Sequence, residues 1–302
     1  MTSGTQILAA QYVTIQDKAQ SLLGTGSETR GYGQTVQSAD VFTGNAITKA
    51  QWDLLRYDII NIRLHQDGTL PNIASVSVGD PIGYGAGSPN SNFDSLLETA
   101  IANRFRLDTS QAVITAKGSA TYTSPWSTSL STTLTLTFAD SNEARYFFNS
   151  GGKIRFTTSL TGGTVTPQYT AWVNILNSIG TRSFGADTDP LITYYTLTNT
   201  FQTYYANFAS SPYSNNSYIL EARTDVANNN TGTATQLFLR VTLADSYVDP
   251  DVATGNVEPP GDSVNGTLTI AVSELKAAGS LQPSGSFTIT SPTYSLSAIS
   301  GS

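Results

Sequence analysis

Few side chains in this sequence could carry out chemistry, and the single histidine, His65, is the first to consider. It stands beside Gln66 and Asp67 near the end of a predicted helix, where a cation would complement the helix dipole. A zinc site needs further His or Cys ligands, and the chain has no cysteine and no second histidine. A Ser-His-Asp triad would require His65 to meet a serine and an acid from distant segments. We therefore predict a capping or packing role for His65, and no enzymatic activity.

Acidic residues gather in one Pro- and Gly-rich segment near the C-terminus, and paired carboxylates are the groups that glycoside hydrolases use. The segment contains Asp245, Asp249, Asp251, Glu258 and Asp262. A calcium loop would alternate its acids around a central glycine, and this spacing does not. Three interpretations stay open, in order of preference: a solvated loop, a weak calcium site and a pair of catalytic carboxylates. The preferred one requires no metal.

Three glycine-rich segments, 24–27, 31–33 and 83–87, contain the residue that phosphate-binding loops require. None is followed by Lys-Ser or Lys-Thr, and none follows an apolar strand, so none completes a phosphate-binding motif. We interpret their glycines as turn residues. No cofactor is expected.

Composition excludes several classes of partner. The formal net charge is −7 and the pI about 4.6, and because nucleic-acid binding depends on Lys and Arg, no nucleic-acid partner is expected. Charged residues make up only 12% of the chain, against roughly 25% in globular domains. Thr, Ser, Asn, Gly and aromatic residues replace them, which favours strands and uncharged loops. No apolar run approaches the ~20 residues of a membrane span, so no membrane partner is expected either.

The elements that position these residues are predicted to be helices first and strands later. Apolar residues recur at helical intervals over Ile7–Leu23, Thr48–His65 and Ser91–Leu107. Thr48 is suited to accept a first-turn amide, and the buried face of the second helix is predicted to hold Trp52, Leu55, Ile59 and Ile62. Leu70–Pro89, rich in Gly and Pro, predicts a connector. The predicted regions are a helical anchor (1–70), a connector with a helix (71–110) and a β-sandwich domain (111–302).

Alternation of apolar and polar residues predicts the strands beyond residue 110. These are Thr132–Phe138, Lys153–Leu160, Ile192–Leu197, Tyr218–Arg223, Gln236–Leu243, Gly266–Val272 and Ser286–Thr290. Short helices are predicted at Ser141–Asn149 and Pro167–Ile179, the second able to cover an open edge or face of a sheet. The predicted fold is mainly β: an antiparallel β-sandwich with short inserted helices, preceded by a small helical N-terminal region.

The stretch Glu143–Phe156 combines aromatic residues, a glycine pair and a strand in a short span. Its three successive aromatic residues cannot all face one side of a short helix. In one interpretation they seal an end of the sandwich while the arginines pair with acids such as Asp140 or Glu143. In the other, at least one contacts a neighbouring subunit. Tyrosines further on have the chemistry to stack on sugar rings, so the candidate interaction surface comprises Arg145, Tyr146, Phe147, Phe148, Arg155, Tyr204, Tyr205 and Tyr213.

Two blocks of sequence carry a resemblance to a known family. The first contains Leu23-Gly-Thr-Gly-Ser27, Gly31-Tyr-Gly-Gln-Thr-Val36, Ile47-Thr-Lys-Ala-Gln-Trp52 and Ile62-Arg-Leu-His-Gln66. The second, within residues 136–156, reads Thr-Phe-Ala-Asp and then Ala-Arg-Tyr-Phe-Phe-Asn-Ser-Gly-Gly-Lys-Ile-Arg-Phe. With these blocks in this order, the chain resembles a family of virion structural proteins of contractile-tailed cyanophages and related marine phages. Residues Asp249–Gly261 depart from the family pattern.

The resemblance implies a structural, non-enzymatic virion component, assembled in the host cytoplasm from copies of itself and other virion proteins. A docking region followed by a projecting sandwich suits an appendage, so we expect a fibre-like tail or neck protein. The alternatives are a capsid-decorating protein and a module that binds a host receptor or surface carbohydrate. Because virion parts are built around rotational axes, a homo-oligomer is expected. The chain lacks the heptads and fixed-period repeats of a long fibre shaft.

Overall fold

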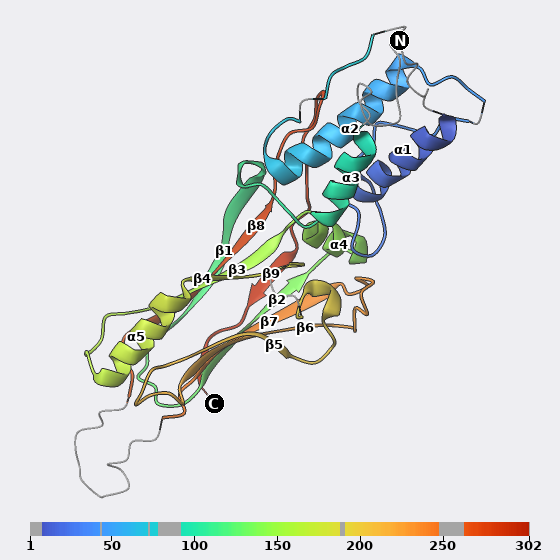
Figure 1. Cartoon of the computed structure of the whole chain (residues 1–302). Helices are drawn as coiled ribbons and strands as arrows, with labels where there is room; N and C mark the ends of the chain where they lie inside the picture. Colours follow the sequence, from blue (N-terminus) through green and yellow to red (C-terminus); the bar gives the residue numbers. More distant parts are fainter. Residues whose placement is uncertain are drawn as a thin grey trace, which may run out of the picture.

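The computed structural model describes residues 8–42, 44–71, 73–77, 92–187, 191–247 and 263–301. The molecule is elongated, with the N-terminal helices at one end, two β-sheets towards the other, and the C-terminal strand far from the N-terminal helices (Figure 1). Within the described part of the chain, no helix is long and apolar enough to cross a membrane.

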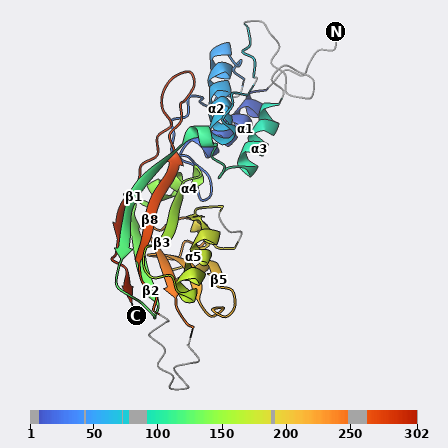
Figure 2. The ribbon, with the colours of Figure 1, turned by 90° about the vertical axis from the view of Figure 1, so that its left-hand side faces the viewer.

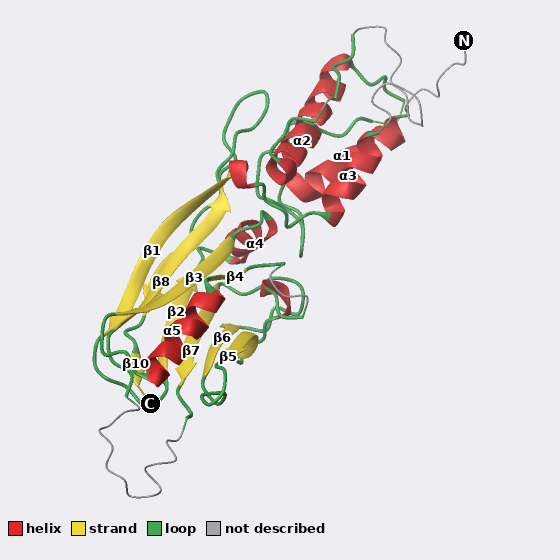
Figure 3. Ribbon diagram, turned by 60° about the vertical axis from the view of Figure 1, so that its left-hand side comes forward, coloured by secondary structure: helices red, strands yellow, loops and turns green. Residues whose placement is uncertain are grey.

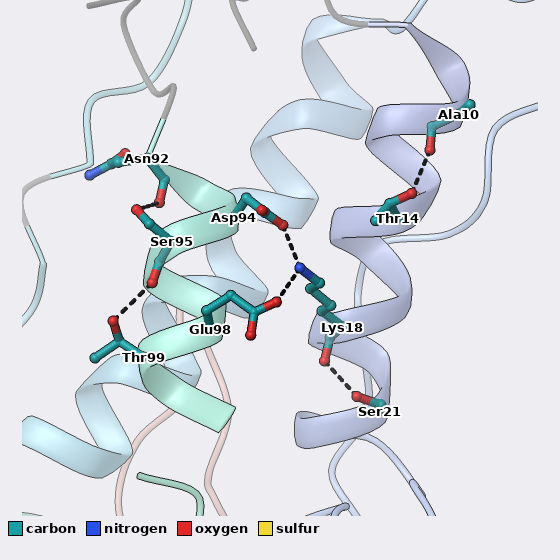
Figure 4. A network of polar contacts seen from close by, with 9 residues as sticks. All are labelled: Ala10, Thr14, Lys18, Ser21, Asn92, Asp94, Ser95, Glu98 and Thr99. Carbon is teal, nitrogen blue, oxygen red and sulfur yellow. Dashed lines mark hydrogen bonds and ion pairs between the residues drawn. The ribbon is translucent and has the colours of Figure 1, made fainter. Parts of the chain in front are cut away.

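Three helices form a bundle at the first end: α1 (Ala9–Leu23), α2 (Lys49–Asp67) and α3 (Phe93–Ala102). Their apolar faces meet at Trp52, whose ring stacks on Phe93 with the centroids 4.6 Å apart. At the surface, Lys18 of α1 lies 2.7 Å from Asp94 and also contacts Glu98, both on α3 (Figure 4). Hydrogen bonds to these two carboxylates raise the pKa of the Lys18 ammonium. An ion pair therefore ties the first and third helices together.

The helix predictions for this end are confirmed in position, and partly in length. α2 begins as expected, since the Thr48 hydroxyl accepts a first-turn amide at 3.3 Å, and its predicted apolar face is buried. α3 ends at Ala102, well before the predicted Leu107. The chain turns there, and Phe105 packs on Tyr195 with the centroids 6.1 Å apart. Apolar spacing does not distinguish a helical residue from one in the turn that follows the helix.

Two antiparallel sheets form the sandwich (Figure 3). The four-stranded sheet has the order β1 (Ala112–Tyr122), β8 (Thr267–Ala277), β3 (Lys153–Thr161) and β4 (Thr181–Phe184). The six-stranded sheet has the order β10 (Ser300–Gly301), β2 (Leu130–Thr137), β7 (Gln236–Ala244), β6 (Ser217–Thr224) and β5 (Gln202–Phe208), and β9 (Thr293–Leu296) also pairs with β2. The predicted fold class is confirmed: mainly β, with inserted helices and a helical N-terminal region.

The alternation that predicted the central strands is also what builds the sandwich core. β7 buries Leu237, Leu239, Val241 and Leu243, while the residues between them stay partly exposed. β8 alternates in the same way. Burying one such side chain contributes roughly 1.5–3 kcal/mol, so these strands supply much of the stabilising free energy.

Two inserted helices, α4 (Ser141–Asn149) and α5 (Pro167–Ile179), lie where the sequence predicts them. α5 starts at Thr166, whose hydroxyl accepts the Tyr169 amide at 3.1 Å. It buries Trp172 against Trp126, with the centroids 5.1 Å apart. α5 contacts β3 of one sheet and β5 of the other, and so covers the opening between them.

The predicted strand at Ile192–Leu197 is wrong. The segment instead contains a short 3-10 helix, η2 (Tyr194–Thr196), and both of its tyrosines are buried. A strand would send successive side chains to opposite faces. The strands β1, β4, β5, β9 and β10 were not predicted. β1 is largely exposed on both faces and therefore shows no apolar alternation.

The predicted strand at Ser286–Thr290 is also wrong. Apart from an isolated bridge between Ser280 and Ser286, this segment joins no ladder. It belongs to a long loop that rises from the sandwich alongside α2 (Figure 2). There the Gln34 side chain donates to the Thr288 carbonyl at 2.9 Å and accepts its amide at 3.2 Å. The backbone of this segment therefore forms hydrogen bonds with a side chain of the helical end and not with a neighbouring strand.

The helical end and the sandwich share one continuous hydrophobic core. Around it, the Asn61 side chain of α2 accepts the Gln282 amide at 2.6 Å and donates to the Gln282 carbonyl at 3.1 Å. The predicted boundary near residue 110 thus separates two kinds of secondary structure without separating two cores. Most of the predicted connector lies outside the described residues.

Candidate functional site

α4 positions the aromatic part of the Glu143–Phe156 stretch. Asp140 caps the helix, since its carboxylate accepts the amides of Asn142 and Glu143 at 2.8 and 2.9 Å. A carboxylate here also complements the positive end of the helix dipole. Asp140 is thus occupied by the helix terminus and does not pair with an arginine.

Arg145 is buried, with only 8% of its surface exposed. Its guanidinium donates to the carbonyls of Arg30 at 3.0 Å, Glu28 at 3.1 Å and Thr25 at 3.2 Å, and to the Asn142 side chain at 2.8 Å. A planar fork of donors suits several acceptors from one loop. Among the described residues Arg145 forms no ion pair, so the predicted pairing with a neighbouring acid is wrong.

Asn149, at the end of α4, holds the same loop. Its side-chain amide donates to the Gly31 carbonyl at 3.2 Å and to the Glu28 carbonyl at 3.3 Å. The Tyr195 hydroxyl lies 2.5 Å from the Asn149 side-chain oxygen and 2.9 Å from the Glu28 carbonyl. Burial raises the pKa of Tyr195, so the hydroxyl stays protonated as a donor. We call Arg145, Asn149 and Tyr195, together with the loop 25–31, the joint.

Tyr146 extends the joint towards the next glycine of the first block. Gly33 has a φ of +69°, and a Cβ atom there would lie 2.4 Å from the Tyr146 ring. Only glycine combines this backbone conformation with such a close approach. The two sequence blocks that carry the family resemblance are therefore in direct contact, although they are far apart along the chain.

Phe147 and Phe148 lie inside the chain and have no exposed surface. Phe148 stacks on Tyr194 with the centroids 4.2 Å apart, and Phe147 meets Phe148 edge-on at 5.1 Å. These two residues seal the end of the sandwich beneath the bundle. A contact with a neighbouring subunit cannot rest on them.

His65 is buried between aromatic rings, and so packs instead of capping. It stacks on Phe287 with the centroids 4.4 Å apart and lies 4.8 Å from Tyr32. Burial lowers the pKa of His65 to about 3, against a weaker opposing effect of a hydrogen bond to the Ser150 backbone. The imidazole is therefore neutral at pH 7 and cannot complement the helix dipole as a cation.

Tyr204 and Tyr205 lie at a cleft of about 390 Å³ where the edge strands of the two sheets meet. The other lining residues are Lys153, Thr181, Arg182, Ser183 and Asp187. We call it the β4–β5 cleft. Arg182 lies 4.1 Å above the Tyr205 ring, and Tyr204 is buried against Phe184 at 5.0 Å.

Charge in the β4–β5 cleft is unevenly paired. Lys153 and Asp187 form an ion pair at 3.0 Å. The Arg182 side chain forms no hydrogen bond or ion pair in the described part of the chain. The same holds for the side chain of Arg155, which lies opposite Ser183 in the ladder between β3 and β4. With these three cations against one carboxylate, the cleft carries a local excess of positive charge.

Tyr213 lies at a second cleft, of about 430 Å³, between α5 and the end of β5. This neutral cleft is lined by uncharged residues, among them Asn174, Asn207 and the 62% exposed Phe208. Tyr213 meets Tyr247 with the ring centroids 4.6 Å apart. The three tyrosines predicted as one surface are thus divided between two clefts.

The acidic segment is described only in part. Asp245 is buried and accepts the Gln168 side-chain amide of α5 at 2.8 Å. Asp249, Asp251, Glu258 and Asp262 lie outside the described residues. Within the described ranges, no group of three or more His, Cys, Asp or Glu side chains is placed to hold a metal ion.

Comparisons with known proteins bring no relative. No family model, no curated protein and no solved structure matches this chain. What the molecule does must therefore be inferred from its own residues.

Three residues of the β4–β5 cleft, Lys153, Arg182 and Asp187, were not singled out in the sequence. The signal that was present is local charge: two of them are basic residues in a chain with only 12% charged residues. Arg182 also stands in a short strand without clear alternation. Only the meeting of β4 with β5 brings it to the predicted Tyr205.

Proposed function

We propose that this protein is a structural, non-enzymatic component of a tailed-phage virion, a fibre-like appendage of the tail or neck. In this arrangement the helical end docks on the particle and the sandwich projects from it. Neighbouring copies of the chain and other virion proteins are its partners.

One observation carries the proposal: the two sequence blocks that resemble virion proteins lie against each other at the joint. Arg145 of the second block donates to the loop 25–31, which lies within the first block, and Tyr146 packs on Gly33. The resembling residues thus form one physical unit, which holds the helices on the sandwich. A rigid joint of this kind suits a subunit that transmits position from a docking end to a projecting end.

The helical end has exposed apolar side chains at which docking can be tested. Phe42 is 80% exposed, Leu8 63% and Leu70 58%. The sandwich also exposes apolar side chains, among them Leu191 at 77% and Val165 at 76%, and because single exposed apolar residues are common on protein surfaces, exposure alone does not choose the docking end. Phe208 on the sandwich is 62% exposed and provides a matched comparison.

The proposal is tested by labelling intact particles with an antibody against residues 111–302 and imaging them by electron microscopy. Label at the tail or neck supports an appendage. Label spread over the head supports the alternative, a capsid-decorating protein, and overturns the appendage. Particles without label overturn a virion role altogether.

A second test asks which end docks. The variants Phe42→Ser and Phe208→Ser each remove one largely exposed ring, the first from the helical end and the second from the sandwich. We expect F42S to lower incorporation into particles and F208S to leave it unchanged, measured by quantifying the protein in purified particles. The reverse result would place the docking surface on the sandwich.

A further inference from the structure

The β4–β5 cleft has the size and position of a ligand site. Its volume of about 390 Å³ lies within the range of roughly 300–1,000 Å³ typical of small-molecule sites. It opens at the edge where β4 and β5, from different sheets, lie next to each other. The site is therefore built on strands, which hold its side chains more firmly than a loop would.

The charge around this cleft opposes that of the whole chain. The net charge of the protein is −7, yet Lys153 and Arg182 line the cleft, Arg155 borders it, and Asp187 is its one lining carboxylate. Lys153 already holds a carboxylate, that of Asp187, at 3.0 Å. Arg182 is stacked on Tyr205 but meets no acceptor among the described residues. An anionic group is the ligand chemistry that would complete it.

Tyr204 adds an independent observation. The residue is only 8% exposed and lines the cleft. Its hydroxyl has no hydrogen-bond partner in the described part of the chain, although buried polar groups are nearly always paired. Burial raises the pKa of Tyr204 well above its ordinary value, so the hydroxyl stays protonated and can donate a hydrogen bond to a ligand.

The remaining lining groups suit a sugar ring. Ser183 and Thr181 bring hydroxyl groups to the lining. The Thr181 hydroxyl shares a hydrogen bond of 2.8 Å with that of Thr157, and because a hydroxyl can both donate and accept, it retains capacity for a sugar hydroxyl. The Tyr205 ring and the stacked Arg182 supply a flat surface. We propose that the β4–β5 cleft binds an acidic saccharide unit, whose anionic group pairs with Arg182 while its ring hydroxyls meet Ser183 and Thr181.

The neutral cleft next to α5 is an internal comparison. It also contains exposed aromatic and amide side chains, Phe208 and Asn174 among them, but no charged residue lines it. A protein that bound sugars through aromatic stacking alone would use this neutral cleft as readily as the β4–β5 cleft. Acid preference therefore discriminates between the two sites, and the inference does not depend on where the protein stands in a virion.

The test is calorimetric titration of the purified full-length protein. The probes are glucuronic acid and a sulfated hexose, which separate a carboxylate from a sulfate as the source of charge, with glucose and sodium acetate as controls. We expect the acidic sugars to bind, glucose and acetate to bind at least about tenfold more weakly, and affinity to fall with added salt. Equal binding of glucose, equal binding of acetate, or no binding of either acidic sugar overturns the proposal.

Variants locate the site. Arg182→Gln is expected to weaken binding by about tenfold, the effect of one charge-assisted hydrogen bond. Its matched control is Arg223→Gln, which removes an arginine stacked 3.9 Å above Phe238 on the other sheet and should leave binding unchanged.

Tyr204→Phe should weaken binding several-fold while leaving thermal stability unchanged or higher, because it removes an unpaired buried hydroxyl. Binding that survives both cleft variants, or that is lost in Phe208→Ala, overturns this location.

Discussion

Arg145 and Arg182 place the same side chain beside a tyrosine ring in two regions of the molecule, with opposite results. Arg145 lies 5.9 Å from the Tyr146 ring and donates to three backbone carbonyls and an amide. Arg182 lies 4.1 Å from the Tyr205 ring and has no hydrogen-bond acceptor in the described part of the chain. Arg145 therefore fixes α4 to the loop 25–31, whereas the guanidinium of Arg182 is available to bind a ligand.

The difference shows that a conspicuous motif and a binding surface need not coincide. The Glu143–Phe156 stretch is dense in aromatic residues because it must fill the end of the sandwich and hold the loop 25–31. The β4–β5 cleft is inconspicuous in the sequence because its residues come from separate strands. Four experiments test whether these two regions differ as described, beginning with the largest expected effect.

The first removes one partner of the joint. Residues 111–302 expressed alone lose the loop that satisfies Arg145 and Asn149, and the bundle that covers Phe287. We expect a loss of more than about 5 kcal/mol, comparable to the whole stability of many domains, and hence no cooperative thermal unfolding. Adding residues 1–110 as a separate polypeptide should restore cooperative thermal unfolding. A stable, monomeric fragment would instead establish the sandwich as an independent domain.

The second removes a single side chain. Arg145→Ala removes the guanidinium donor from the carbonyls of Thr25 and Arg30 and one of three donors from that of Glu28, and because these hydrogen bonds come from a buried charged group, we expect the free energy of unfolding to fall by about 3 kcal/mol. Arg145→Lys should recover part of this, because an ammonium cannot match the planar fork. Chemical denaturation measures both. A change below about 1 kcal/mol in R145A would contradict the role of the joint.

The third uses pH. The pKa of His65 is about 3 in the folded protein and about 6.5 in an unfolded chain, so only the unfolded state takes up a proton as pH falls below about 6.5. Folded stability is therefore full above pH 6.5 and declines below it. Between pH 6.5 and 5 the loss should be about 2 kcal/mol.

His65→Leu is the control for this pH dependence. Because the chain has no other histidine, the decline between pH 6.5 and 5 should flatten in H65L, whatever its absolute stability. Denaturation midpoints at both pH values measure it. Parallel declines in the two proteins would show that His65 is accessible to protons.

The smallest effect is expected at the other arginine. Arg182→Gln should change the free energy of unfolding by no more than about 0.5 kcal/mol, because a partly exposed side chain without hydrogen bonds contributes little to stability. Thermal unfolding of R182Q beside R145A makes the comparison directly. A large loss in R182Q would show that Arg182 is structural, and would remove the contrast between the two regions.

Local patterns in the sequence determined much of the secondary structure. The capping residue Thr48 and the apolar face of α2, the start of α4 after Asp140, and the alternation in β7 each act over a few residues. Such signals survive without knowledge of the rest of the fold. The fold class followed from them, because strands buried on one face must pair into sheets that cover each other.

Only the tertiary structure decided what each side chain does. Arg145 could have paired with a nearby acid such as Glu143, yet it donates to carbonyls more than 110 positions earlier in the chain, those of Thr25, Glu28 and Arg30. Ser286–Thr290 alternates like a strand, but its backbone is hydrogen-bonded by the Gln34 side chain and not by a neighbouring strand. The β4–β5 cleft exists because two edge strands from different sheets end side by side. Alternation specifies which face of a segment is buried, whereas the partner of that face is set by contacts between segments far apart in the chain.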